Sequence, residues 1–84
     1  MKYKEQIPKN NLRAIRKTLG ISQNNVKDIL ELYSTDCISH CELGRSVPSI
    51  INLFRLSRIY GIPPEKLYEN LVENIDQEIS DKQK

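Results

Sequence analysis

The 84-residue sequence predicts an all-α fold, namely a compact five-helix domain with a C-terminal helical extension. Two observations carry this prediction. Apolar residues recur at steps of three or four, which is the spacing of one face of a helix. Capping residues, glycines and prolines separate these periodic stretches. A chain of this size buries only about 60% of its unfolded surface, so we expect a small core of helices packed on helices.

The first ten residues show no periodicity and contain a proline, so residues 1–10 are expected to form a basic N-terminal arm. The first helix is predicted to begin at Asn10 or Asn11, because asparagine is a good capping residue. It should end at Gly20, since glycine readily adopts the conformation that terminates a helix. Its apolar positions are Leu12, Ile15 and Leu19. Its polar positions are Arg13, Arg16 and Lys17.

The stretch of residues 22–42 is predicted to form two short helices joined by a tight turn. The Ser22 hydroxyl can accept a hydrogen bond from a free amide of the first turn, so the first of these helices should begin there. Its apolar face comprises Val26, Ile29 and Leu30. The second helix should begin at Ser34 or Thr35 and cover residues 34–43. Its apolar stripe is Cys37, Ile38 and Cys41, and its opposite, polar face is Thr35, Asp36, Ser39 and His40.

Residues 43–49 are predicted to form a turn, because Gly44 can end a helix and Pro48 cannot continue one. A fourth helix should begin at Ser49 and end at Gly61. Its expected inward residues are Ile50, Leu53, Phe54, Ser57 and Tyr60, with Arg55 and Arg58 outward.

A fifth helix should begin at the segment Pro63-Pro64-Glu65, since proline and an acidic residue both suit a first helical turn. Its apolar stripe has steps of four residues and consists of Leu67, Leu71, Ile75 and Ile79.

The formal net charge of +2 is unevenly distributed along the chain. Residues 1–20 hold six Lys and Arg against one Glu, whereas residues 73–84 hold four acidic residues against two Lys. This asymmetry suits a polyanionic partner, and it also fits a solvated tail and helix face. No apolar run approaches the ~20 residues of a membrane span, and the segment MKYKEQIPK has no apolar stretch for a secretory signal. We therefore expect no membrane association, a cytoplasmic location and reduced cysteines.

Three possible metal ligands, Cys37, His40 and Cys41, fall on one turn of the predicted third helix. A structural zinc site needs four ligands, and the sequence contains no other Cys or His. Apolar periodicity already explains the two cysteines as small core residues. A Cys-His nucleophilic pair would need a pocket and an oxyanion site, which a minimal helical domain does not readily provide. We predict no enzyme activity, no metal site, no cofactor and no small-molecule ligand.

Four features occur in a characteristic order along the chain. They are the segment LGISQ, an apolar helix, the pattern I-x-x-x-E-x-G, and a proline four residues after that glycine. The chain resembles the Cro and phage-repressor type of helix-turn-helix domain, the XRE family with a lambda-repressor-like fold. The resemblance covers about residues 11–71, and the complete pattern is more specific than any one part. The matching residues are Leu19, Gly20, Ile21, Ser22, Gln23, Ile38, Glu42, Gly44, Pro48, Leu53, Tyr60, Gly61, Ile62 and Leu67.

This resemblance implies that residues 11–71 form the DNA-binding domain and that the helix at 34–43 enters the major groove. The residues implied to read bases are Thr35, Asp36, Ser39 and His40. Those expected to bind phosphates are Gln23, Asn24 and Arg45. Arg16 and Glu42 are implied to form a structural ion pair, although they could also be two independent surface charges.

The sequence departs from the family pattern around the helix-helix turn. Lys27 stands where the family commonly has a small residue. The segment Glu31-Leu32-Tyr33 stands where it has a glycine, and the spacing from Gln23 to Glu42 is one residue longer. The geometry of this turn is therefore the least determined part of the predicted fold.

The resulting functional prediction is a sequence-specific, double-stranded DNA-binding transcriptional regulator of repressor type, nucleoid-associated and homodimeric. Residues 72–84 would be a C-terminal extension, with Leu71, Ile75 and Ile79 forming the dimer; alternatively, it folds back on the domain or frays. The rival function is a protein interaction module of the same fold. Asp36 favours this rival, because DNA phosphates repel a carboxylate at the start of the recognition helix.

Overall fold

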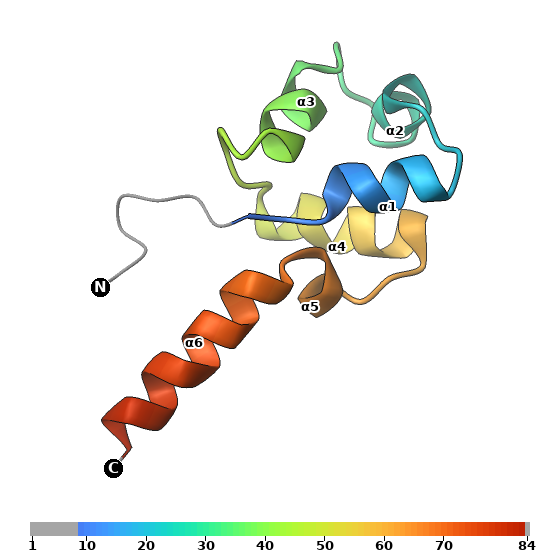
Figure 1. Cartoon of the computed structure of the whole chain (residues 1–84). Coiled ribbons are helices and arrows are strands. Elements are labelled where there is room, and N and C mark those ends of the chain that lie inside the picture. Colours follow the sequence, from blue (N-terminus) through green and yellow to red (C-terminus); the bar gives the residue numbers. More distant parts are fainter. Residues whose placement is uncertain (1–8, 84) are drawn as a thin grey trace.

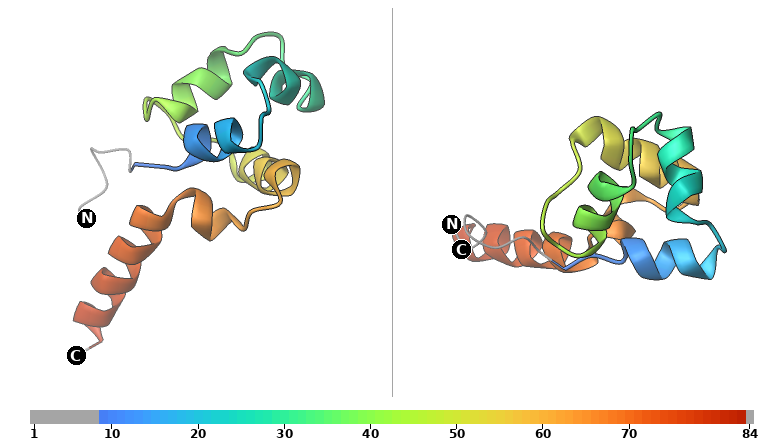
Figure 2. Two further views of the ribbon diagram at one scale, coloured as in Figure 1. Left: turned by 45° about the vertical axis from the view of Figure 1, so that its right-hand side comes forward. Right: turned by 90° about the horizontal axis from the view of Figure 1, so that it is seen from above.

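The computed structural model describes residues 9–83, and all regular secondary structure in that range is helical. The predicted arm at residues 1–10 lies outside the described range except for its last two residues. The helices are α1 (Leu12–Thr18), α2 (Gln23–Ile29), α3 (Asp36–Glu42), α4 (Ile50–Tyr60), α5 (Pro64–Leu67) and α6 (Glu69–Lys82). Helices α1–α5 pack together, and α6 extends away from them (Figures 1 and 2). The predicted all-α class and the five-helix domain with a helical extension are confirmed.

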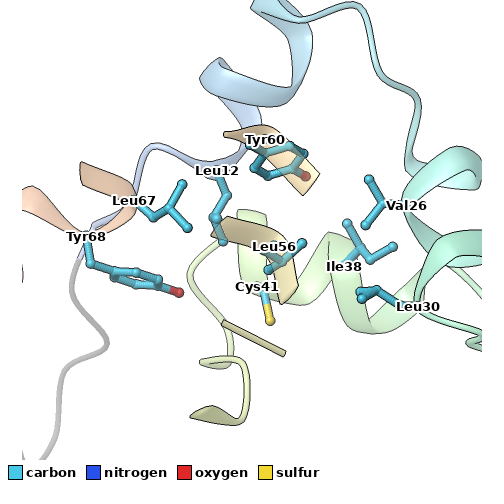
Figure 3. Packing of buried hydrophobic residues seen from close by; sticks show 9 residues of the cluster. All are labelled: Leu12, Val26, Leu30, Ile38, Cys41, Leu56, Tyr60, Leu67 and Tyr68. Carbon is cyan, nitrogen blue, oxygen red and sulfur yellow. The ribbon is translucent and has the colours of Figure 1, made fainter. Parts of the chain in front are cut away.

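One hydrophobic cluster forms the core of α1–α5, and Figure 3 shows its side chains converging from α1, α2, α3, α4 and the α5 region. The cluster consists of Leu12, Val26, Leu30, Ile38, Cys41, Leu56, Tyr60, Leu67 and Tyr68. Leu12, Val26 and Leu67 are the most completely buried. None of the described helices is long and apolar enough to cross a membrane.

The N-termini of three helices are held by polar side chains. The Ser22 hydroxyl accepts a hydrogen bond from the Asn25 amide at 3.0 Å, and the Asn25 side chain accepts one from the Ser22 amide, which confirms the predicted cap. Ser49 caps α4 in the same way through the amide of Asn52. At α1 the side chain of Asn10, not Asn11, accepts from the Leu12 amide at 3.0 Å.

Helices α1, α2 and α3 all end with the same pair of backbone hydrogen bonds around one left-handed residue, the arrangement known as the Schellman motif. Gly20 and Gly44 occupy this position after α1 and α3, with φ of +72° and +78°. After α2 the position is taken by Glu31, whose φ is +57°. There the Glu31 amide donates to the Asp28 carbonyl and the Leu32 amide to the Lys27 carbonyl. The turn therefore forms without the family's glycine.

The connection between α2 and α3 is longer than the predicted tight turn, because residues 30–35 separate the two helices. The predicted helix at 34–43 is correspondingly shorter and covers Asp36–Glu42. The Ser34 hydroxyl accepts from the Asp36 amide at 3.2 Å, whereas the Thr35 side chain caps nothing. Ser34 thus ends the loop and Thr35 occupies the cap position through its backbone alone.

Five residues predicted to lie on the apolar faces of their helices are exposed instead: Leu19, Ile29, Cys37, Ile50 and Phe54. In α4 the buried residues are Leu56, Ser57 and Tyr60, so the inward face is rotated relative to the prediction. Leu56 is not among the predicted inward residues, because apolar residues occur on several sides of this helix and periodicity alone does not select a face.

The prediction of a single fifth helix is wrong. The helix is interrupted at Tyr68, between α5 and α6, where φ is −131° and ψ is +51°. The Tyr68 side chain is buried in the core cluster, and its backbone departs from helical geometry there. Leu67 belongs to the core, whereas Ile75 and Ile79 lie on a separate helix and are 38% and 48% exposed.

Candidate nucleic-acid interface

Helix α3 has a buried side and an outer side. Ile38 and Cys41 are buried in the core cluster. Helical spacing places Thr35, Asp36, Ser39 and His40 on the opposite side. Asp36 and His40 are exposed, and Thr35 and Ser39 are half-buried. Within residues 9–83 none of these four side chains makes a hydrogen bond or an ion pair, so their polar groups are available to a ligand.

The far end of α3 is fixed by the Glu42 carboxylate, which accepts three hydrogen bonds. Arg16 of α1 donates two, from Nε to Oε2 at 2.6 Å and from Nη2 to Oε1 at 3.1 Å. Gln23 of α2 donates the third, from Nε2 to Oε1 at 3.0 Å. The structure therefore contains the Arg16–Glu42 ion pair, and it joins α1, the start of α2 and the end of α3 in one network.

This network is almost closed to solvent, since the side chains of Arg16 and Glu42 are only 10% and 3% exposed. Arg16 uses a further donor, Nη1, on the carbonyl of Ile21 at 3.0 Å. The hydrogen bond to Glu42 is the main cause that raises the Arg16 pKa, although burial opposes it. Removing either residue of such a buried pair should destabilise the fold, because the charge of the other residue would remain buried without an opposite charge beside it.

The three residues expected to bind phosphates lie at the edges of α3. Gln23 and Asn24 begin α2, which packs against α3, and Arg45 lies three residues after the end of α3, in the loop. Asn24 and Arg45 are exposed. Gln23 is half-buried and keeps a second amide hydrogen after bonding Glu42. The Arg45 backbone amide donates to the His40 carbonyl at 2.8 Å, which holds the loop against the end of α3.

The two cysteines of α3 have different environments. Cys37 is exposed, and Cys41 is buried with its Sγ 3.6 Å from the Ser46 hydroxyl. Burial raises the pKa of the Cys41 thiol, and the contact with Ser46 lowers it. Across residues 9–83 no group of three or more His, Cys, Asp or Glu is arranged to hold a metal ion.

Sequence reasoning missed two contacts that hold α3. One is the bond from Gln23 to Glu42, which joins residues 19 positions apart. The other runs from the Asn10 side chain to the Cys41 carbonyl at 2.8 Å. The adjacent Asn11 side chain donates to the Lys66 carbonyl at 2.9 Å, so this asparagine pair joins the start of α1 to both α3 and α5. The two asparagines were interpreted only as alternative caps.

Comparison with known sequences identifies the domain. Residues 12–67 match the helix-turn-helix family, which is about two thirds of the chain and spans α1 to α5. Neither the curated proteins nor the solved structures give a significant match. The family is one of DNA-binding regulators and not of enzymes. The chain therefore belongs to the XRE-type helix-turn-helix family, the Cro and repressor-like class of DNA-binding transcription regulators.

Proposed function

We propose that the chain is a homodimeric repressor that recognises a specific operator by placing α3 in the major groove of double-stranded DNA. The observation that carries this proposal is the division of α3. Its end is fixed by three hydrogen bonds to Glu42, while the side chains on its outer side have no hydrogen-bond or ion-pair partner within residues 9–83. A rigid helix with unused donors and acceptors is what direct base readout requires.

Each outer side chain offers a defined chemistry to base edges. His40 can donate to a guanine acceptor, and Asp36 can accept from the amino group of cytosine. Thr35 and Ser39 can either donate or accept. Gln23, Asn24 and Arg45 would bind the phosphates on either side and set the register of α3. Arginine suits this role because its rigid fork of donors matches phosphate.

We include a homodimer in this proposal because α3 is too short to contact many base pairs alone. A helix of seven residues contacts few base pairs, and dimers of this class gain specificity by presenting two such helices about 34 Å apart. Leu71, Ile75 and Ile79 of α6 are apolar, and the last two are substantially exposed. We assign the dimer contact to these residues. Occupation of the operator by the dimer would then block transcription.

Asp36 supports a second candidate, an interaction module for proteins. It is exposed in the first turn of α3, where an approaching phosphate would be repelled. Salt dependence separates the two candidates, because neutralising phosphates makes the logarithm of DNA affinity fall steeply with the logarithm of salt concentration. A flat salt response on random duplex DNA, or no binding at low salt, would favour the interaction module.

The assignment of roles is tested on an operator selected from random DNA. His40→Ala should cost about 1 to 3 kcal/mol on that operator and relax its preference, because it removes a base contact. Arg45→Ala should weaken binding to all sequences alike. Lys66→Ala is the control, since it removes one positive charge from α5. Helix α5 lies away from α3 (Figure 1). Equal losses for His40→Ala on operator and random DNA would exclude base reading by this residue.

A further inference from the structure

An exposed apolar surface outside the reading side of α3 lies between α2 and α4. Ile29 of α2 and Ile51, Phe54 and Ile59 of α4 line a groove there, together with Arg55 and Arg58. Ile29, Ile51 and Phe54 are 59%, 61% and 53% exposed. We refer to these six residues as the α2/α4 groove. Exposed apolar clusters of this kind mark contact sites for other macromolecules.

The two arginines of the groove carry unused charge. They are one helical turn apart, at i and i+3, and both are exposed. The Arg55 side chain donates to Asn52 at 3.3 Å, and within residues 9–83 no carboxylate pairs with either arginine. The groove is therefore lined by apolar side chains and by two arginines without carboxylate partners in the described residues.

Helix α6 has the opposite character. Its apolar side contains Leu71, Val72, Ile75 and Ile79. Glu73 and Asp76 are also one turn apart and exposed, and no cation in residues 9–83 pairs with them. By helical spacing Asp76 borders the apolar side, and Glu73 lies one turn earlier and further from that side. An apolar stripe with two acidic residues at i and i+3 thus matches an apolar groove with two arginines at i and i+3.

We infer that α6 of each chain occupies the α2/α4 groove of a second copy, with Ile75 and Ile79 against Phe54 and Ile51 and the acidic pair against the arginine pair. The occupant cannot be the chain's own α6, because that helix points away from α2 and α4 in every view (Figures 1 and 2). A two-fold arrangement makes the contact twice. Doubling matters, because stable dimers bury about 1,200 to 2,000 Å² in total and one helix of 14 residues covers only part of that area.

This inference rests on the proposed homodimer and names the surface that α6 contacts. It differs from pairing of α6 with its counterpart, in which the groove would play no part. The two arrangements are distinguished by the mass of the full-length chain in sedimentation equilibrium without DNA, so the result does not depend on operator binding. Wild type should approach a dimer mass with increasing concentration and should not exceed it.

Two variants, one substituted in α6 and one in the groove, should have the same effect. Ile75→Asp with Ile79→Asp, and separately Phe54→Asp, should each raise the dimer dissociation constant by more than about tenfold. Leu19→Asp is the matched control, because Leu19 is 48% exposed and lies outside the groove. Circular dichroism verifies that each variant remains folded. An equimolar mixture of the α6 variant and the Phe54 variant should recover part of the dimer, because one intact contact forms between them.

A charge exchange tests the ionic part and uses exposed residues only. Arg55→Glu with Arg58→Glu should weaken the dimer, and adding Glu73→Lys with Asp76→Lys to the same chain should restore it. Arg13→Glu with Lys17→Glu on α1 is the charge-matched control and should leave the mass unchanged. If the α6 variant is monomeric while the groove variants remain dimeric, the inference is overturned and the proposed α6 dimer stands. If the α6 variant also remains dimeric, or wild type is monomeric throughout, both are overturned.

Discussion

Helices α1–α5 and helix α6 contrast in how they are stabilised. Every buried apolar residue of the described chain lies between Leu12 and Tyr68, whereas the 14 residues of α6 include none. The hydrogen bonds of Asn10, Asn11, Arg16 and Gln23 join distant parts of α1–α5. The side-chain bonds within α6 join residues four apart, from Gln77 to Asp81 and from Lys82 to Glu78.

This difference has a physical consequence for α6. Exposed pairs four residues apart contribute only about 0.3 to 0.5 kcal/mol each, and an isolated helix of 14 residues is marginal in water. The domain can therefore fold from its own contacts, whereas α6 gains most of its stability from whatever covers its apolar side. A partner for α6 and a folded domain are separate requirements.

The largest expected effect comes from comparing one carboxylate of the packed domain α1–α5 with one carboxylate of α6. Glu42→Ala should destabilise the chain by about 3 to 5 kcal/mol, because it leaves Arg16 buried without its partner. Glu69→Ala in α6 breaks an exposed pair with Lys66 at 3.5 Å and should cost less than about 1 kcal/mol. Urea denaturation gives both values. Similar losses for the two variants, or a double-mutant cycle without coupling between Arg16 and Glu42, would remove the distinction.

A second test uses alkaline pH, which should act on the domain through Tyr60 and Tyr68. Burial is the main cause that raises the pKa of each tyrosine from 10 to about 12. Because the pKa of each tyrosine is higher in the folded chain than in the unfolded chain, the free energy of unfolding is not reduced by these groups below pH 10. It falls as the pH rises from 10 through 12, where the unfolded chain loses the tyrosine protons more readily. The two groups together should reduce the free energy of unfolding by about 3 kcal/mol at pH 11 relative to pH 8.

Tyr68→Phe provides the control for this pH dependence. Among the described residues the buried Tyr68 hydroxyl has no hydrogen-bond partner, so its removal should cost little at neutral pH. The variant should lose about half of the alkaline destabilisation, measured by denaturation at pH 8 and pH 11. An unchanged pH dependence would show that Tyr68 titrates normally in the folded chain.

The smallest expected effect concerns the turn after α2, where one backbone residue of the packed domain is strained. Glu31 has φ of +57°, and a left-handed conformation costs a residue other than glycine about 1 to 2 kcal/mol. Glu31→Gly should therefore stabilise the domain by about 0.5 to 1 kcal/mol after the greater entropy loss of glycine is included. Gly20→Ala is the reverse control and should destabilise, because no atom obstructs an added Cβ and only the φ of +72° opposes it. A loss of stability in Glu31→Gly would contradict this account.

Much of the fold could be predicted from local chemistry. Ser22, Gly20 and Gly44 mark helix ends through bonds to their immediate neighbours, and such signals are complete within a few residues. The faces of short helices were harder, because α4 has apolar residues nearly all round and only its neighbours decide that Leu56 is inward and Phe54 outward. The interruption at Tyr68 could not be predicted, because apolar residues recur every four positions on both sides of it and so indicate one continuous helix.

The buried and outer sides of α3 were predictable to a similar degree. Periodicity alone separated Ile38 from Ser39 and His40, because buried and outer residues alternate in a known way on a helix. Cys37 shows the limit, since it borders the buried side and only packing determined that it is exposed. The bond from Gln23 to Glu42 had no local signal, because it depends on how two helices meet.

The division of α3 into an anchored end and an unbonded outer side also bears on how this protein could change its target. Thr35, Asp36, Ser39 and His40 contribute no side-chain bond to the described fold, so exchanging them carries little structural penalty. Ile38, Cys41 and Glu42 would remain, and the backbone that presents the new side chains would keep its position. Under the proposed role of α3, a few surface substitutions would be enough to change the preferred DNA sequence while the fold stays the same.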